Sequence, residues 1–338
     1  MIKSGFLKLI LIITLISLLA MPEICPAEDD FSQWLEKLRT EALAKGISAA
    51  TLDTAFTGLQ PIPRVIELDR NQPEFKYDLW SYLDLVITES RIKKGRQMLY
   101  THRKLLNKIR ARYGVQPRFL VAIWALETNF GANIGKFPVI GAVATLAHDT
   151  RRSGFFRNEL LSALTILDES HISISDMRGS WAGAMGQLQF MPSTFVRFAV
   201  DEDKDGRKDI WHSLPDVFGS AANFLSGNGW DSHFTWGRQV QLPKDFNQQL
   251  IGLNTEKTLS DWKELGIRRA DGNTLKGVTI MASLIQTSGS GNPSFLVYGN
   301  FRAVMQWNPS YLYALAVCHL ADRLEGAGPL QKTDRDTK

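Results

Sequence analysis

The stretch VAIWALETNFG, residues 121–131, decides the fold, because it is apolar enough to form a core helix. It also carries one carboxylate, Glu127, among these apolar residues. Pro117 is a typical first residue of a helix and Gly131 is a typical stop, so we expect a helix over residues 117–130. A helix that is apolar on nearly every side belongs in a protein core. The sequence therefore predicts a helical core packed around this segment.

Glu127 lies near the C-terminal end of that expected helix. Partial burial and the negative end of the helix dipole both raise the pKa of a carboxyl group. A carboxylic acid that keeps its proton near neutral pH can protonate a glycosidic oxygen. The alternative is a structural glutamate that pairs with an arginine or caps a backbone amide, and this segment alone leaves both interpretations open.

A second segment, GSWAGAMGQLQFMPS at residues 179–193, is rich in small residues. Small residues leave space above the backbone, so a ligand can approach it closely. Ser180, Gln187, Gln189 and Phe190 add hydroxyl, amide and aromatic groups, a mixture that suits a sugar-binding groove. The alternative is a tight turn packed beneath a helix.

Helical periodicity continues along most of the chain. We expect further helices over residues 31–46, 48–56, 90–113, 155–170, 192–199, 214–226 and 310–324. After residue 230 the pattern changes, and strands are expected over residues 238–242, 277–285 and 294–298, with a short helix around 259–265. The fold class predicted is mainly α, of the α+β type, with a small β-containing insert.

The loop DEDKDGRKD, residues 201–209, has the spacing of an EF-hand. Asp201, Asp203, Asp205 and Asp209 occupy loop positions 1, 3, 5 and 9, and Gly206 occupies position 6. Arg207 would offer its backbone carbonyl. His212 replaces the bidentate glutamate of position 12, and Asp216 is the best substitute. We expect a weak structural calcium site; the alternative is a solvated acidic loop.

Composition places the chain among ordinary globular proteins, with 44% hydrophobic and 22% charged residues in 338. The net charge of +4 is weakly basic, and no basic run is interleaved with aromatic residues, so a nucleic-acid partner is not expected. The histidines lack H-E-x-x-H spacing, and there is no phosphate-cradling glycine loop. Zinc and nucleotide chemistry are therefore not predicted.

The N-terminus has the form of a secretory signal. Lys3 and Lys8 precede an apolar stretch over residues 9–21, and Ala27 precedes an acidic run. We expect cleavage after Ala27; the alternative is an uncleaved membrane anchor. Cleavage would remove Cys25 and leave Cys318 alone, so no internal disulfide is expected.

Several segments, in this order, resemble the membrane-bound lytic transglycosylase B family of bacterial peptidoglycan enzymes, including its soluble relatives. They are LDRNQPEF at 68–75, residues 122–131, Thr150-Arg151-Arg152, residues 180–193, and Trp307-Asn308 followed by YALAV at 313–317. The resemblance spans about residues 31–324. It implies a lysozyme-like helical core, an accessory helical domain and a small β domain.

The resemblance also implies the reaction, which is cleavage of the β-1,4 bond between N-acetylmuramic acid and N-acetylglucosamine to leave a 1,6-anhydro sugar. Glu127 matches the single catalytic residue, acting first as acid and then as base, with no cofactor. Ser180 and Gln189 match polar groove residues, and Tyr313 matches an active-site tyrosine. Arg151 and Arg152 match a basic pair beside the groove that would meet stem-peptide carboxylates.

Two departures from the family pattern concern the groove. Trp307 and Phe155 stand where some relatives carry tyrosine, so a hydroxyl contact is missing there, although we keep Trp307 as a substrate-binding candidate. Gln187 occupies a variable position. Relatives carry a calcium site at the loop of residues 201–216, which supports the metal prediction.

The expected organisation follows from these pieces. Residues 1–27 form the signal, 28–112 a helical domain, 113–230 with 301–327 the catalytic core, 231–300 the β-containing domain and 328–338 a disordered tail. We expect a periplasmic monomer whose partners are glycan strands and proteins of cell-wall synthesis or division.

Two rival functions remain open at this point. A lysozyme-like hydrolase would use the same groove but would let water attack the sugar. A wall-binding protein would keep the groove and do no chemistry, although the intact motif around Glu127 speaks against it.

Overall fold

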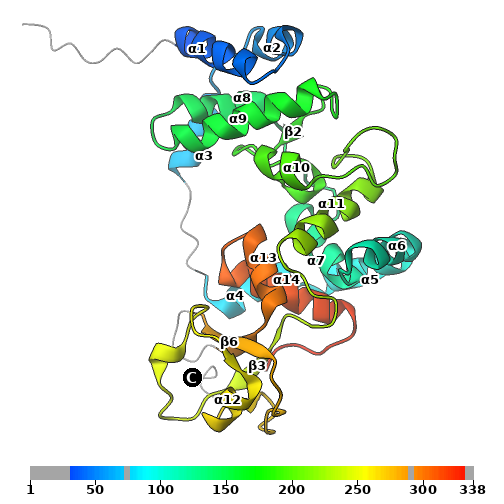
Figure 1. The fold of residues 1–338 in the computed structure, drawn as a ribbon, viewed down its shortest axis with the longest axis vertical. Helices are drawn as coiled ribbons and strands as arrows, with labels where there is room; N and C mark the ends of the chain where they lie inside the picture. Colours follow the sequence, from blue (N-terminus) through cyan, green and yellow to red (C-terminus); the bar gives the residue numbers. More distant parts are fainter. Residues whose placement is uncertain (1–30, 72–76, 288–292, 332–338) are drawn as a thin grey trace, which may run out of the picture.

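The computed structural model describes residues 31–71, 77–287 and 293–331 (Figure 1). The predicted signal with Cys25, residues 72–75 of one family motif, and residues 332–338 of the predicted tail lie outside the described residues. Within the described ranges, no helix is long and apolar enough to cross a membrane.

Helices dominate the structure, as predicted. Before the segment that carries Glu127 they are α1 (Phe31–Ala44), α2 (Ala49–Phe56), α3 (Pro63–Arg70), α4 (Leu79–Val86), α5 (Glu89–Thr101) and α6 (Arg103–Tyr113). From that segment onward they are α7 (Pro117–Thr128), α8 (Val139–His148), α9 (Ser153–Asp168), α10 (Pro192–Phe198), α11 (Leu214–Gly227), α12 (Leu259–Glu264), α13 (Gly299–Trp307) and α14 (Tyr311–Leu324).

Local signals explain where several helices begin and end. The Ser48 side chain accepts a hydrogen bond from the Thr51 backbone N–H, so it caps α2 as expected. Gly114 takes the left-handed conformation, with φ 75°, and ends α6. The predicted single helix over 90–113 is instead two helices that meet at His102. Pro63 begins α3, because proline suits the first turn of a helix.

One continuous apolar core runs through the helical body, from Phe31 in α1 to Leu324 in α14. The helices before α7 divide between two neighbourhoods: α2 packs on α9 and α3 on α8, whereas α4 and α5 pack on α14 and α6 packs on α11. Figure 1 shows α1, α2, α8 and α9 together at one end of the molecule. The predicted helical domain 28–112 therefore has no core of its own, because its helices cover two parts of the same core.

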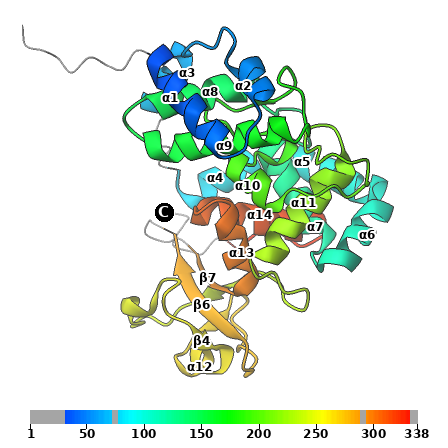
Figure 2. The same ribbon diagram turned by 45° about the horizontal axis from the view of Figure 1, so that its top comes forward.

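The β-containing insert holds one antiparallel sheet of five strands in the order β4-β6-β7-β3-β5. The strands are β3 (Gly237–Gln241), β4 (Lys257–Thr258), β5 (Arg268–Arg269), β6 (Met281–Gln286) and β7 (Ser294–Val297). Strands β6 and β7 are in register at Leu284 and Leu296. A second apolar core forms here around the fully buried Trp262 of α12. Figure 2 shows this domain at the end of the molecule away from α1 and α2.

Half-buried polar contacts join the β domain to the helical body. The Trp236 Nε1–H donates to Asp322 Oδ2 of α14 at 2.8 Å, and Asn300 Nδ2 donates to the carbonyls of Asp231 and Phe234 at 2.8 Å. Burial raises the pKa of the Asp322 carboxyl. The insert is thus fixed to the first turn of α13 and the last turns of α14.

The described part of the predicted disordered tail, residues 328–331, is held against the sheet. Gln331 and Gln239 exchange two hydrogen bonds, of 2.7 and 2.9 Å, so residues up to 331 are held against β3. The charge of the tail predicts disorder, but the backbone amide and carbonyl of Gln331 find a partner on the strand.

Candidate active site

Glu127 is the last residue but one of α7, where the chain turns sharply out of the helix. Asn129 and Phe130 both have positive φ, at 51° and 62°, although neither is glycine. The Asn129 and Phe130 N–H groups donate back to the carbonyls of Ala125 and Trp124, which ends the helix two residues earlier than predicted. Backbone held in this region often marks a functional site.

The environment of Glu127 favours its protonated form. Burial of the carboxyl raises its pKa to about 7, although hydrogen bonds with the side chains of Tyr313 and Trp307 lower it. The Tyr313 hydroxyl of α14 donates to Glu127 Oε1 in a short hydrogen bond. Among the residues that the structure describes, no other carboxylate contributes to the pKa shift of Glu127. The result is a single carboxyl group whose proton is available near neutral pH.

Trp307, at the end of α13, is held over the same carboxyl by packed rings. Its ring centroid lies 5.0 Å from Phe190 and 4.8 Å from Phe224. Trp307 thus contributes a side-chain hydrogen bond to Glu127, so the hydroxyl expected to be missing is replaced by the indole. Phe190 is only 2% exposed, so we correct its predicted sugar contact: it supports Trp307 from below.

Ser180 and Gln189 lie on the loop that follows β2 (Arg178–Gly179), which pairs with β1 (Phe137–Pro138). Ser180 Oγ accepts the N–H groups of Ala182 and Ala184 at 3.3 and 3.0 Å, which leaves its own hydrogen free to donate. The Gln189 amide nitrogen donates to the carbonyls of Ile134 and Gly186. Among the described residues its Oε1 accepts no hydrogen bond, so it can accept one from a ligand.

Other atoms of the protein occupy the space beside the small residues of this loop. This corrects the expectation that these residues leave room for a ligand. A Cβ atom at Gly179 would overlap the carbonyl of Ala184, and one at Gly186 would overlap the carbonyl of Ile210. The loop is therefore the tight turn of the alternative interpretation, and it presents polar groups by folding closely on itself.

Gln187 plays a structural part rather than a binding one. Its Oε1 accepts from Trp124 Nε1, and its amide nitrogen donates to the carbonyl of Trp211, both at 2.8 Å. The side chain is 9% exposed. Since both ends of the amide are used within the protein, Gln187 ties the loop to α7 and is not a sugar contact.

Arg151 and Arg152 converge on one buried carboxylate, Asp69 of α3. Arg151 bonds Asp69 Oδ2 at 3.0 Å and its backbone carbonyl at 2.7 Å, and Arg152 bonds Oδ1. The Arg152 guanidinium also lies 5.0 Å from the centroid of the Phe156 ring. The predicted basic pair therefore forms ion pairs that join α3 to the start of α9.

The acidic loop brings together three of its six predicted ligands. Oxygens of Asp201, Asp203 and Asp205 lie within 4.8 Å of one another. Asp216 instead accepts the backbone N–H groups of Glu202 and Asp209, each at 2.7 Å, and Asp209 accepts those of Trp211 and His212. Hard carboxylate oxygens grouped in this way fit calcium, but Asp216 holds the loop backbone and does not replace the missing glutamate.

Tyr82 of α4 is a site residue that the sequence does not reveal. Burial and the negative charge of Glu127 both raise the pKa of its phenol, and Tyr82 in turn raises the pKa of Tyr313. It therefore lies beside the carboxyl, on a helix that only the tertiary structure brings there. No periodicity or motif in residues 79–86 distinguishes this tyrosine from others.

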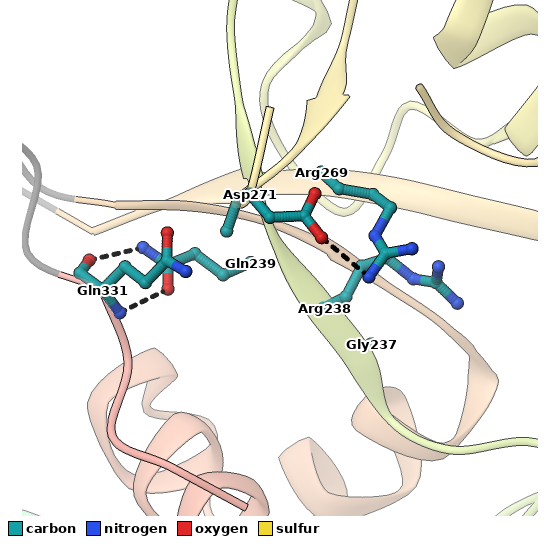
Figure 3. Close-up of a pocket in the computed structure, with 7 residues that line it drawn as sticks. Gly237, Arg238, Gln239, Arg269, Asp271 and Gln331 are labelled. Atoms are coloured by element: carbon teal, nitrogen blue, oxygen red, sulfur yellow. Dashed lines mark hydrogen bonds and ion pairs between the residues drawn. The ribbon is translucent and has the colours of Figure 1, made fainter. Parts of the chain in front are cut away.

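A separate hollow of about 380 Å³ lies at the edge of the β domain (Figure 3). It is lined by Arg238, Arg269 and Asp271, together with the paired Gln239 and Gln331. Arg269 and Asp271 neutralise each other at 2.9 Å. Glu127 does not line this hollow, so it is not the place of the reaction.

The sequence of this chain is similar to those of known proteins. Residues 30–322 match the family model described as the transglycosylase SLT domain. Over 242 residues the chain is 32% identical to the membrane-bound lytic murein transglycosylase B of Escherichia coli strain K12. That match covers 71% of this chain but 65% of the relative, so this chain spans just under two thirds of that relative's length.

Two solved structures are similar over most of the chain. SltB3 of Pseudomonas aeruginosa, in complex with NAG-anhNAM-pentapeptide, is 43% identical with a TM-score of 0.86, covering 90% of this chain and 81% of that one. The Escherichia coli lytic transglycosylase Slt35, in complex with calcium, is 27% identical with a TM-score of 0.73, covering 87% and 92%. The predicted fold class, a lysozyme-like helical body with a small β insert, is confirmed by these similarities.

Proposed function

This chain belongs to the transglycosylase SLT domain family, and we propose that it is a lytic transglycosylase that cleaves the β-1,4 bond between N-acetylmuramic acid and N-acetylglucosamine in peptidoglycan. The observation that carries the proposal is the state of Glu127. Its pKa of about 7, and its hydrogen bonds with Tyr313 and Trp307, suit a group that must first give and then take a proton.

The reaction needs one carboxyl group used twice. Glu127 protonates the glycosidic oxygen as the bond to C1 breaks, and the N-acetylglucosamine hydroxyl leaves. Glu127, now a carboxylate, takes the proton of the C6 hydroxyl of the muramic acid as that oxygen bonds to C1. The 1,6-anhydro ring closes and Glu127 regains its proton. Within the described part of the chain no second carboxylate influences Glu127, which supports stabilisation of the positive charge by the substrate's own N-acetyl group.

Polar side chains on the loop after β2 would contact the sugar near Glu127. Ser180 can donate its hydroxyl hydrogen and Gln189 can accept at Oε1, so both suit sugar hydroxyls and the acetamido arm. Tyr313 and Trp307 hydrogen-bond to the carboxyl and lower its pKa, and the charge of Glu127 in turn raises the pKa of the Tyr82 phenol. The SltB3 complex with NAG-anhNAM-pentapeptide supports the same product class for this chain.

The calcium site is a further part of the proposal. The grouped oxygens of Asp201, Asp203 and Asp205 would hold the ion, and the Slt35 complex with calcium supports this assignment. The ion would neutralise repulsion among the acids and order the loop between α10 and α11. It would take no part in proton transfer. We also propose export to the periplasm, in keeping with a cell-wall substrate and with the N-terminal signal pattern.

Product mass tests the proposal. The protein from residue 28 onward is incubated with peptidoglycan sacculi, and the soluble muropeptides are weighed by mass spectrometry. We expect products that end in 1,6-anhydro-N-acetylmuramic acid. Products heavier by one water would identify a hydrolase, and no soluble product with the protein bound to sacculi would identify a wall-binding protein.

A further inference from the structure

Helices α5 and α6 carry an unusual concentration of positive charge. Between Ser90 and Val115 the chain has no acidic residue, and it carries the lysines and arginines Arg91, Lys93, Lys94, Arg96, Arg103, Lys104, Lys108, Arg110 and Arg112. The whole chain has a net charge of only +4. The remainder of the molecule is therefore net negative, and the excess of positive charge lies on these two consecutive helices.

Most of these charges face solvent. Their exposed members are Lys93, Arg96, Arg103, Lys104, Lys108, Arg110 and Arg112, which we call the basic face. Glu202 takes up part of this charge, because its buried carboxylate pairs with Lys108 at 3.2 Å and Arg112 at 2.8 Å. Lys93, Lys104 and Arg110 form no ion pair within the described ranges.

The basic face begins beside the end of the catalytic helix. Helix α5 packs on α7, and the Lys94 ammonium lies 4.8 Å from the centroid of the Phe130 ring. Phe130 follows Glu127 in the turn that ends α7. Figure 1 shows α5 and α6 on an outer side of the molecule next to α7. A polymer that leaves the site on this side would pass over the basic face.

The groups expected to meet substrate carboxylates lie elsewhere and are already paired. Arg151 and Arg152 share Asp69, which is 3% exposed, so one buried negative charge offsets half of their positive charge and holds both guanidinium groups in place. Of the exposed cations of α5 and α6, Lys108 and Arg112 share the buried Glu202, whereas Lys93, Lys104 and Arg110 have no ion-pair partner among the described residues. These three are the better receptors for carboxylates on a ligand.

We propose that the basic face binds the carboxylates of the peptide side arms that project from the glycan strand, and so holds the polymer while Glu127 acts on it. The inference rests on the proposed function, since it extends the same substrate beyond the reacting sugars. A single exposed ion pair is weak, but several cations along one surface attract a polyanion together, and salt weakens that attraction.

An anionic bilayer fits the surface less well. Helices that bind membranes present an apolar ridge beside their lysines. On α5 and α6 the one large apolar side chain that is well exposed is Tyr100, at 70%, and the Arg103 guanidinium lies 4.6 Å from its ring centroid. The basic face has charge for a polyanion but little apolar surface to insert.

The test compares binding to sacculi before and after their carboxylates are converted to neutral amides with a carbodiimide and methylamine. Every protein carries Glu127→Gln, so the sacculi are not consumed and binding is measured separately from catalysis. The basic-face variant is Lys93→Gln, Lys104→Gln and Arg110→Gln. The matched control, Lys244→Gln, Lys263→Gln and Lys276→Gln, removes the same charge from exposed positions of the β domain.

We expect co-sedimentation at low salt to show roughly tenfold tighter binding to native than to amidated sacculi. The basic-face variant should lose most of that preference, the β-domain control should keep it, and high salt should abolish it. Equal behaviour of the two variants would overturn the inference, as would equal losses on both kinds of sacculi. Binding to anionic phospholipid vesicles that depends on the basic face would also overturn it. Failure of the proposed function shows separately, as absent anhydro products from the unaltered protein.

Discussion

At the scale of single residues, the site is a carboxyl group whose proton is regulated by its neighbours. Burial raises the pKa of Glu127 to about 7, while Tyr313 and Trp307 donate to its charged form and limit the rise. The balance sets the proton affinity between those of an ordinary acid and an ordinary base, which one group needs if it is to serve as both.

Glu127→Gln should lower the rate of anhydro-product formation by about a hundred- to ten-thousand-fold, because the amide cannot donate the proton. Soluble anhydro-muropeptides released from sacculi provide the measurement. Binding to sacculi should persist, since the amide keeps the shape of the side chain. Turnover within tenfold of the unaltered protein would show that Glu127 is not the acid.

The same variant should change the dependence of stability on pH. The folded pKa of Glu127 is about 7 against 4.5 when unperturbed, so its stabilising contribution is complete below about pH 4.5 and is lost as pH rises through 7. Glu127→Gln removes this loss. Urea unfolding should find the variant more stable by up to about 3 kcal/mol at pH 8 and nearly equal at pH 4.5.

Tyr313→Phe should make the Glu127 carboxyl less acidic, because it removes a donor that favours the charged form. The descending limb of kcat/KM, expected near pH 7, should move up by about one pH unit. Tyr311→Phe on the same helix is the matched control, since that ring packs on Phe301. An unmoved limb in Tyr313→Phe would show that this hydroxyl does not set the pKa.

At the scale of elements, the site depends on close backbone approaches. The loop after α7 reaches the end of β2 so closely that a Cβ atom at Gly135 would overlap the carbonyl of Gly179 and the amide of Ser180. Gly135 also has φ 93°, which other residues rarely adopt. This approach sets the position of Ser180 relative to Glu127.

Gly135→Ala should therefore cost about 2–3 kcal/mol and lower activity, because either the loop or Ser180 must move. Urea unfolding and product release measure the two effects. Gly154→Ala is the control: it lies near the start of α9, and a Cβ atom there meets nothing within 4 Å. The control should be neutral or slightly stabilising. Equal stability of the two variants would contradict the packing account.

The acidic loop between α10 and α11 should make stability depend on calcium. At a concentration about tenfold above the Kd, the ion should add about 1.4 kcal/mol, or roughly 2–4 °C in Tm, and a chelator should reverse the change. Asp203→Asn with Asp205→Asn should abolish the response, whereas Asp271→Asn in the β domain should keep it. An unaltered protein with the same Tm in calcium and chelator would refute the site.

At the scale of the whole molecule, two cores are joined by apolar packing and by a few polar contacts. The β domain has its own core around Trp262, whereas Ile285, Phe295 and Val297 of its sheet pack in the core of the helical body. The polar part of the link runs through Trp236, Asp322 and Asn300. Buried hydrogen bonds to a carboxylate hold orientation more strictly than apolar contacts do. The orientation of the insert relative to α14 thus depends on specific donors.

Trp236→Phe should destabilise the protein by about 1–3 kcal/mol, because the half-buried Asp322 loses a donor. Native-state proteolysis should cut residues 229–236 faster as the insert loosens. Gln239→Ala on the next strand removes only exposed hydrogen bonds, so its stability should stay within about 0.5 kcal/mol of the unaltered protein. A variant at Trp236 that resists protease equally would contradict this view of the joint.

Local chemistry explains how much of this could be predicted. Helix caps such as Ser48 and Gly114, the apolar helix around Glu127 and the strands of the insert follow from short-range patterns, and the structure has them within a few residues. The position of Glu127 in a last turn also follows from neighbouring residues, and the apolar sequence around it predicts the burial that raises its pKa. These features depend on the backbone and on side chains close in sequence.

Only the tertiary structure determined which distant residues each polar or aromatic side chain of the site contacts. The amide of Gln187 and the ring of Phe190 look suited to sugar, but both are turned into the core by residues distant in sequence. Tyr82 joins the site on a helix that carries no signal of it. Whether a polar side chain faces a ligand or a neighbour depends on which distant segment covers it, and that is set by packing of the whole chain rather than by local pattern.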